Sequence, residues 1–377
     1  MNPTVSVIIP TFNRAHLVGQ AIDSVLQQTY TDYEVLVVDD GSTDGTGAVV
    51  EAYGDRVGYI RTTHGGVGHA RNVGMHRARG RYLTWLDSDD LLYPYALELH
   101  TRVLDRFPDA AFVCAEMSAF DDTGFSERYH LRTYHQSAYR NPVVTYDRIF
   151  ESSIPLADTG LLPQRLIDDD PGAVARRAYF GNIFDTYVLD IVICQTGVLL
   201  RRAIVQAVGW RNERLKYWEE VDFLLRICRQ HPICFVDVPT YKQRYHDGQI
   251  STTAGADGKY IWMRKQQALL GMVKRHALGD VAYYERRRTA VDEHLAHLHR
   301  AVAVPMMLAG TGAASTRRYA RRARVYLARC RRHGRHQWTL WLLSFMPGPI
   351  RRLGVTIVQR LSRARFSGVR RRGPVPS

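Results

Sequence analysis

The feature that most constrains this fold is an apolar run at residues 82–86 that ends abruptly in three carboxylates, Asp87, Asp89 and Asp90. A near-continuous hydrophobic run is typical of a strand that is buried on both faces of a parallel sheet. In an open α/β sheet, ligands bind beyond the carboxyl ends of such strands. Crowded carboxylates repel one another. Two explanations fit these carboxylates. They bind a hard cation that holds a substrate phosphate, or they cap the N-terminus of a helix.

Two further apolar runs end in polar or acidic turns. Residues 5–9 lead into the turn 10–13, and residues 33–38 lead into the acidic turn 39–42. Each run is followed by a helical pattern, so the three runs predict βαβαβ organisation with a shared carboxyl edge. The apolar residues that recur at helical spacing after the first run are Leu17, Val18, Ala21, Ile22, Val25 and Leu26.

The net charge of +14 is unevenly distributed along the chain. Residues 259–377 hold 26 Lys and Arg against 4 Asp and Glu, whereas residues 1–258 hold 25 against 33. After Glu293 there is no acidic residue, and all 18 basic side chains are Arg. This asymmetry predicts a domain boundary near residue 258 and a polyanionic partner for the basic tail.

Cysteine usage indicates a reducing compartment. The five cysteines are odd in number and show no metal-knuckle spacing, so we expect reduced, mostly buried thiols in a cytoplasmic protein. The chain begins directly with a strand pattern, which predicts that no signal peptide precedes it. The cysteines are Cys114, Cys194, Cys228, Cys234 and Cys330.

A glycine-rich loop at residues 65–68 leads into Arg71 and Asn72. It is not a Walker loop, because no Gly-Lys-Ser/Thr follows, and it fails the dinucleotide pattern, because Arg71 occupies the place of the third glycine. The loop is either an anion-binding turn, since the Arg fork matches phosphate oxygens, or a plain turn with a solvated Arg.

The middle of the chain is less regular. We expect a loop-and-helix insertion at residues 121–190, in which residues 168–170 form a solvated acidic turn, and a strand at residues 191–200. Two aromatic residues at 217–218 then precede Glu219 and Glu220 in the first turn of a predicted helix. The helix dipole explains acidic residues there, and desolvation by an aromatic ring would equally suit a general base.

Four motifs in order resemble the family 2 glycosyltransferases of GT-A fold, densely over residues 4–110 and more weakly to about residue 255. The resemblance implies an α/β fold with a GT-A type, Rossmann-like mixed sheet flanked by helices, followed by the basic, mainly helical C-terminal region. It divides residues 1–258 into a nucleotide-sugar-binding half, 1–110, and an acceptor half, 111–258. The motifs are residues 5–13, the turn 37–44, Ala70-Arg71-Asn72 with Gly74, and residues 80–90.

The resemblance implies transfer of a sugar from a nucleotide-sugar, most often with inversion at the anomeric carbon. Phe12 and Asp40 would contact the base, uracil in a UDP-sugar, and Asp87 would lie at the ribose. Asp89 would bind an Mg²⁺ or Mn²⁺ ion that bridges the diphosphate, with His246 near the same metal. The nucleotide-sugar-binding residues implied in this way are Pro10, Thr11, Phe12, Asp40, Arg71, Asp87 and Ser88.

The family commonly carries Glu-Asp at the helix start, and its Asp deprotonates the acceptor hydroxyl. Here the aligned residue is Glu220, one methylene longer, which can perform the same proton transfer. Glu219 is the alternative base. The acceptor would be a glycan or a lipid-linked acceptor in polysaccharide biosynthesis at the cell envelope.

The basic tail is predicted to be helical over residues 260–332 and carries an apolar, aromatic segment at 337–346. That segment is about half the roughly 20 residues that a spanning helix needs. Trp beside Arg-rich sequence suits a helix lying at an anionic membrane surface, which predicts peripheral association with the inner face of the cell membrane. Docking on the catalytic domain is the alternative. Nucleic acid is not expected as a partner, because no stacking platform accompanies the arginines.

Two other functions remain open from the residues alone. A sugar-nucleotide pyrophosphorylase would carry a Gly-rich, basic loop after the first strand, where residues 10–14 stand instead. A non-catalytic adaptor with an Arg-rich tail for membranes or nucleic acid would not need intact Asp40, Asp87 and Asp89.

Overall fold

The computed structural model describes residues 2–131, 145–157, 159–246, 249, 258–309, 316–322 and 325. The chain forms two compact units, Met1–Gln249 and Ile250–Ser377. The assignment of a catalytic domain up to residue 258 and of a separate tail stays a prediction.

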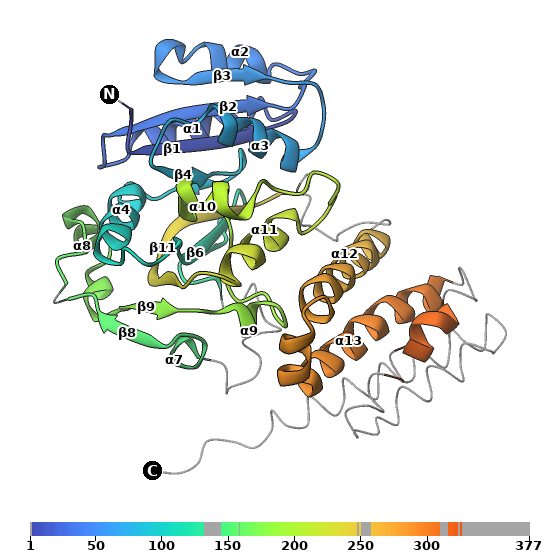
Figure 1. Cartoon of the computed structure of the whole chain (residues 1–377). Coiled ribbons are helices and arrows are strands. Elements are labelled where there is room, and N and C mark those ends of the chain that lie inside the picture. Colours follow the sequence, from blue (N-terminus) through green and yellow to red (C-terminus); the bar gives the residue numbers. More distant parts are fainter. Residues whose placement is uncertain are drawn as a thin grey trace. The chain divides into compact units, whose positions relative to one another are not determined.

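The first unit contains one mixed sheet with the strand order β3-β2-β1-β4-β10-β6-β11-β9-β8, while β5 pairs with β11 and β7 with β6 (Figure 1). The strands are β1 (Val5–Thr11), β2 (Tyr33–Asp39), β3 (Gly58–Arg61), β4 (Tyr82–Trp85), β5 (Leu91–Leu92), β6 (Phe112–Asp121), β7 (Ser126–Glu127), β8 (Ser152–Pro155), β9 (Arg177–Gly181), β10 (Leu199–Arg201) and β11 (Ile233–Tyr245). The helices are α1 (Val18–Leu26), α2 (Thr46–Glu51), α3 (Val67–Arg77), α4 (Ala96–Arg106), α7 (Tyr146–Ile149), α8 (Gln164–Asp169), α9 (Phe184–Tyr187), α10 (Arg202–Val208) and α11 (Glu219–Cys228).

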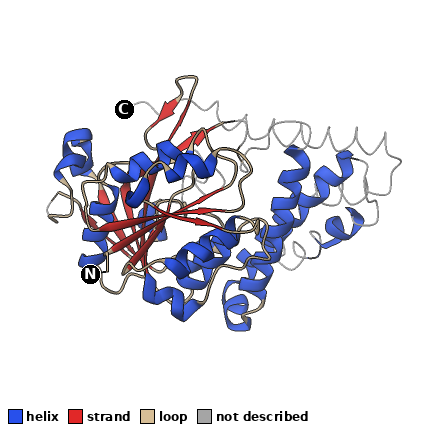
Figure 2. Ribbon diagram, turned by 90° about the horizontal axis from the view of Figure 1, so that it is seen from above, coloured by secondary structure: helices blue, strands red, loops and turns tan. Residues whose placement is uncertain are grey.

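The hydrophobic runs of the sequence become the centre of this sheet. Every residue of β1 and β4 is buried, because helices cover both faces of the sheet (Figure 2). β1 pairs in parallel with β2 and β4, and β2 pairs in parallel with β3. The predicted mixed α/β fold and its βαβαβ beginning are confirmed.

The topology brings the three predicted turns to one edge. β2 and β4 lie on opposite sides of β1, which makes the carboxyl end of β1 a topological switch point, where open α/β sheets bind ligands. α3 packs directly on this strand at Gly74, where a Cβ atom would lie 2.4 Å from Ile8 Cγ2. The close approach fixes the position of Arg71 one helical turn earlier.

Some predictions for the middle of the chain are wrong. Residues 191–198 are not a strand, and only β10 forms there, since Gly197 has φ +75° and its N–H donates to Trp85 O. The expected loop-and-helix insertion contains the strand pair β8 and β9, which extends the sheet through β11. Asp168 and Asp169 lie in α8 rather than in a turn. Residues 132–144 lie outside the described residues.

The described part of the second unit is helical, as predicted for residues 260–332. α12 (Gly258–Val273), a π-helical turn (Lys274–Leu278) and α13 (Val281–Ala309) form a helical pair whose core includes Val273, Val291 and Leu295. Among the described residues, no helix is long and apolar enough to cross a membrane. The aromatic segment at 337–346 and Cys330 lie outside the described residues.

Candidate functional site

The turn after β1 is held to the turn after β2 by side chains that cap backbone groups. Asn13 adopts φ 52°, and its N–H donates to Ser42 Oγ at 2.8 Å. Asn13 Oδ1 accepts from the N–H of Thr43 at 2.8 Å, and Asp44 Oδ2 accepts from the N–H of Ala15 at 3.2 Å. The clamped turn leaves the ring of Phe12 exposed, at 39% of its surface.

Asp40 organises the glycine-rich loop. Its two carboxylate oxygens accept the N–H groups of Gly65 and Gly66, each at 2.8 Å, and Oδ2 lies 3.0 Å from His64 Nδ1. The imidazole of His64 lies against Phe12, with ring centroids 4.4 Å apart. The sequence reasoning missed His64, although it directly precedes the glycines. The predicted base contacts Phe12 and Asp40 are thus brought together.

Pro10 and Thr11 are the last residues of β1 and are buried. Among the described residues, the hydroxyl oxygen of Thr11 has no hydrogen-bond partner, and the Thr11 carbonyl accepts the N–H of Asp40 at 2.9 Å. The buried end of β1 is thus joined by its backbone to Asp40 and leads directly into Phe12.

The acidic turn after β4 lies beside these residues. Asp87 Oδ1 accepts from Arg71 Nη2 at 2.6 Å, and Asp87 Oδ2 accepts from Thr196 Oγ1 at 3.2 Å. Ser88, which lies between Asp87 and Asp89 in the sequence, is buried. Burial, together with the charges of Asp89 and Asp87, raises the pKa of Asp90 well above its usual value. The turn therefore concentrates negative charge that a cation would offset.

Asp89 and His246, the two residues predicted to lie at a metal ion, are in contact. His246 Nε2 lies 3.1 Å from Asp89 Oδ2, and Arg14 Nε lies 4.0 Å from the same oxygen. The described residues hold no cluster of three or more His, Cys, Asp or Glu side chains suited to a metal. One carboxylate and one imidazole fit an Mg²⁺ or Mn²⁺ ion that takes its other ligands from water and substrate phosphates.

β11, which the sequence reasoning did not predict, carries the support for this turn. The N–H of Arg244 donates to Asp90 Oδ1 at 2.9 Å, and Arg244 Nε donates to the Asp89 carbonyl at 3.2 Å. The same guanidinium reaches Gln20 and Asp122, and it lies over the ring of Phe120. Arg244 thus anchors the acidic turn. His246 directly follows the end of β11 and lies beside the same turn.

Arg71 lies between the acidic turn and α11. Its guanidinium is 6% exposed and donates through Nη2 to Asp87 and through Nη1 to Glu219 Oε1, the latter at 2.5 Å. The neighbouring Asn72 exchanges hydrogen bonds with the backbone of Arg211, at 3.0 and 3.1 Å. The two adjacent side chains of α3 therefore hold the segment that leads into α11.

Glu219 is enclosed by arginines. Its carboxylate is 2% exposed, and Arg211 Nη1 lies 3.6 Å from the oxygen that Arg71 contacts. Despite burial, the charges of Arg71 and Arg211 lower the pKa of Glu219 to about 2. Arg211, which the sequence reasoning missed, lies over the rings of Trp85 and Phe223 at 4.5 and 4.9 Å.

Glu220 is only partly buried and has the opposite electrostatic character. Burial and the neighbouring ionised Glu219 raise the pKa of Glu220 well above its usual value. The residue before the pair, Trp218, has φ 62°. Among the described residues, Trp218 and Asn13 alone combine a positive φ with a side chain, and each adjoins a predicted site residue. Such backbone conformations persist where the surrounding structure enforces them, often at functional sites.

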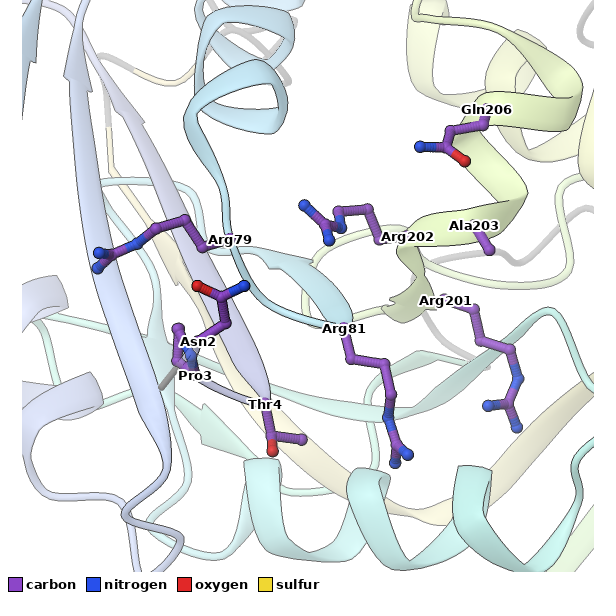
Figure 3. Close-up of a pocket in the computed structure, with 9 residues that line it drawn as sticks. All are labelled: Asn2, Pro3, Thr4, Arg79, Arg81, Arg201, Arg202, Ala203 and Gln206. Atoms are coloured by element: carbon purple, nitrogen blue, oxygen red, sulfur yellow. The ribbon is translucent and has the colours of Figure 1, made fainter.

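A separate hollow of about 490 Å³ lies near the amino ends of β1 and β4, away from these turns (Figure 3). Arg79 and Arg81 in its lining pair with Glu34 and Asp105, respectively. Its other arginines donate to carbonyls of the α4 and α3 ends, which explains them as helix caps. Its lining includes Asn2, Thr4, Arg79, Arg81, Arg201, Arg202 and Gln206, so no predicted site residue lines it.

Comparison with known proteins finds a matching family model and several proteins of similar sequence. The model described as Glycosyl transferase family 2 matches residues 6–207. An uncharacterised glycosyltransferase of Rickettsia typhi is 28% identical over 257 residues, which cover 67% of this chain and 67% of that protein. The uncharacterised glycosyltransferase EpsJ of Bacillus subtilis is 42% identical over 93 residues, covering 24% of this chain and 27% of that protein.

Among solved structures, the mannosyltransferase PcManGT from Pyrobaculum calidifontis, in complex with GDP-Man and Mn²⁺, has a TM-score of 0.50. It is 15% identical, and the match covers 95% of this chain and 87% of that one. This likeness shows the fold, which is the GT-A type predicted from the sequence.

Proposed function

The chain belongs to glycosyl transferase family 2, and we propose that it transfers a sugar from a nucleotide-sugar to an acceptor hydroxyl with inversion at the anomeric carbon. We take a UDP-sugar as the donor and a glycan or lipid-linked molecule of the cell envelope as the acceptor. The observation that carries the proposal is the meeting of three strand-end turns at one sheet edge. They bring an exposed aromatic ring, a buried Asp and an acidic cluster together.

In this proposal, Phe12 stacks on the nucleobase and Asp40 contacts its edge, above Pro10 and Thr11. Asp87 and Ser88 lie along the ribose. Asp89 and His246 would hold an Mg²⁺ or Mn²⁺ ion, which offsets the negative charge that develops on the departing diphosphate. PcManGT, solved with GDP-Man and Mn²⁺, gives a precedent for such a donor and metal in this fold.

On the acceptor side, we assign the general base to Glu220. Glu219 is committed to two guanidinium groups, whereas no ion pair engages the carboxyl of Glu220 among the described residues. A carboxyl with a raised pKa is suited to accept a proton from a hydroxyl near neutral pH. The enzyme would act at the inner membrane face, with the basic tail on anionic lipid.

Two measurements test the proposal on the full-length protein. Binding of UDP with Mn²⁺ should raise the melting temperature, because a ligand that binds only the folded state stabilises it. Incubation with UDP-, GDP- and dTDP-sugars and acceptor should release a nucleoside diphosphate from one of them. Release of a nucleoside triphosphate with pyrophosphate as co-substrate would indicate a pyrophosphorylase. No nucleotide binding would support the adaptor.

A further inference from the structure

A buried row of alternating charges connects the two sides of the site. Asp87 Oδ1 contacts Arg71 Nη2 at 2.6 Å, and Arg71 Nη1 contacts Glu219 Oε1 at 2.5 Å. Arg211 Nη1 ends the row, 3.6 Å from Glu219 Oε1, and its guanidinium is 1% exposed. Arg71 therefore divides its charge between a carboxylate of the donor side and one of the acceptor side.

Glu220 is the third carboxylate beside only two guanidinium groups. Its carboxyl interacts with that of Glu219, and burial together with the charge of Glu219 raises the pKa of Glu220 well above its usual value. Glu220 interacts electrostatically with Arg71 of α3 and with Arg211 of the segment before α11. It also interacts with the buried phenol of Tyr187 in α9. On α11 itself, Asp222 is paired with Arg226 at 3.3 Å. Because Arg71 also pairs with Asp87, only part of its charge offsets the two glutamates.

We propose that Arg71 couples the donor side to the base: when the donor engages Asp87, the charge of Arg71 turns to the Glu219–Glu220 pair and Glu220 releases its proton to water. Glu219 and Arg211 are positioning residues in this coupling. The ionised Glu220 then accepts the proton of the acceptor hydroxyl, whose oxygen forms the new bond to the anomeric carbon. The bond from that carbon to the diphosphate breaks, and its electron pair leaves with the nucleoside diphosphate. The coupling rests on the proposed function.

Tight packing around this row of charged side chains couples a change of charge at Asp87 to Glu220. A Cβ atom at Gly68 would lie 3.2 Å from Glu219 Cγ, so α3 and α11 are in close contact at this point. The rings of Trp85 and Phe223 fix the guanidinium of Arg211. Since these groups have little room to relax, a change of charge at Asp87 acts on the carboxyl of Glu220.

Calorimetry of UDP binding in the presence of Mn²⁺ tests the coupling without turnover. With full-length protein in two buffers of different ionisation enthalpy, wild type should release more protons per UDP bound than Glu220→Gln does. The difference should be about half a proton at the pH at which free Glu220 is half-protonated, because Glu220 is then almost fully ionised in the UDP complex. An equal proton count in the two proteins would overturn the coupling alone. Failure of UDP, GDP and dTDP to bind would overturn the proposed function and the coupling with it.

The pH–rate profiles give an independent readout. The acidic limb of kcat reports the donor complex and that of kcat/KM for the donor reports the free enzyme, so we expect the kcat limb to lie about 1–3 pH units lower. In Asp87→Asn the two limbs should converge, because Arg71 already faces the glutamates. Asp222→Asn is the matched control from the same helix and should keep the separation. Coincident limbs in wild type would overturn the coupling.

Discussion

Arg71 Nη1 lies 2.5 Å from Glu219 Oε1, although 148 residues separate the two in sequence. The pair is buried and joins α3, beside the predicted nucleotide site, to the start of α11. Removing one partner of such a pair leaves an uncompensated buried charge, which costs about 3–5 kcal/mol. The contact therefore holds the proposed donor and acceptor sides in register as well as setting their electrostatics.

The acidic turn after β4 gives the first prediction. Asp89→Ala should abolish metal-dependent sugar transfer, because Asp89 is the carboxylate nearest His246 and the diphosphate would lose its counter-charge. Transfer is measured at saturating Mn²⁺. Asp168→Ala removes an exposed carboxylate from α8 and should leave the rate unchanged. Wild-type turnover in Asp89→Ala would refute the metal assignment.

The second prediction concerns the base. Glu220→Gln should slow the chemical step by roughly 10²–10⁴-fold, the usual contribution of a positioned general base, while UDP affinity changes little. Single-turnover rates and UDP binding are the measurements, and Glu220→Asp should recover part of the rate. If Glu219→Gln is crippled while Glu220→Gln transfers sugar normally, the base is Glu219.

The third prediction concerns the exposed ring of Phe12. Stacking of a base on an aromatic ring is worth about 1–3 kcal/mol, so Phe12→Ala should weaken UDP binding by roughly 5- to 150-fold. The affinity is measured by calorimetry. Phe125 has a similarly exposed ring at 42% and lies beyond β6, so Phe125→Ala is the control and should bind UDP as wild type does. Equal affinities of the two variants would contradict the stacking role.

The fourth prediction concerns Glu116 of β6, a buried carboxyl away from the acidic turn. It accepts the N–H groups of Met117 and Leu131 and the hydroxyl proton of Tyr146. Burial raises the pKa of Glu116 from 4.5 to about 7. Between these values the unfolded chain has lost the proton that the folded chain keeps, so stability falls as pH rises, by up to about 3 kcal/mol.

Glu116→Gln should remove this part of the pH dependence, because its side chain does not titrate. Unfolding free energies of both proteins from pH 4.5 to 8 give the comparison, and wild type should lose more stability than the variant as pH rises. Identical slopes would show that Glu116 titrates normally in the folded chain.

The fifth prediction concerns the basic tail. Full-length protein should co-sediment with anionic vesicles at low salt, since each basic residue near such a surface contributes about 1 kcal/mol that salt screens. Replacing Trp338, Trp341 and Phe345 by Ser should remove the part of the binding that persists at high salt. Neutral vesicles are the control. Absence of binding at low salt would leave the tail as a docking or oligomerisation element.

The sequence by itself determined the strands that end at the site. β1, β2 and β4 are buried on both faces, so their burial is visible as continuous apolar runs, and the acidic turns that follow mark their ends. The first turn of α11 could be predicted for the same reason, because its acidic start and apolar spacing are local. These patterns need no knowledge of distant partners.

Only the tertiary structure decided which distant groups meet. Nothing in the sequence around Arg211 signals its place between Trp85 and Glu219, and β11 was not predicted although it supports the acidic turn through Arg244. The apolar residues 191–198 looked like a strand, yet the turn at Gly197 ends the ladder there. The spacing of apolar residues in the sequence indicates how a segment is buried. The pairing of charges across more than 100 residues depends on how the sheet and its helices pack.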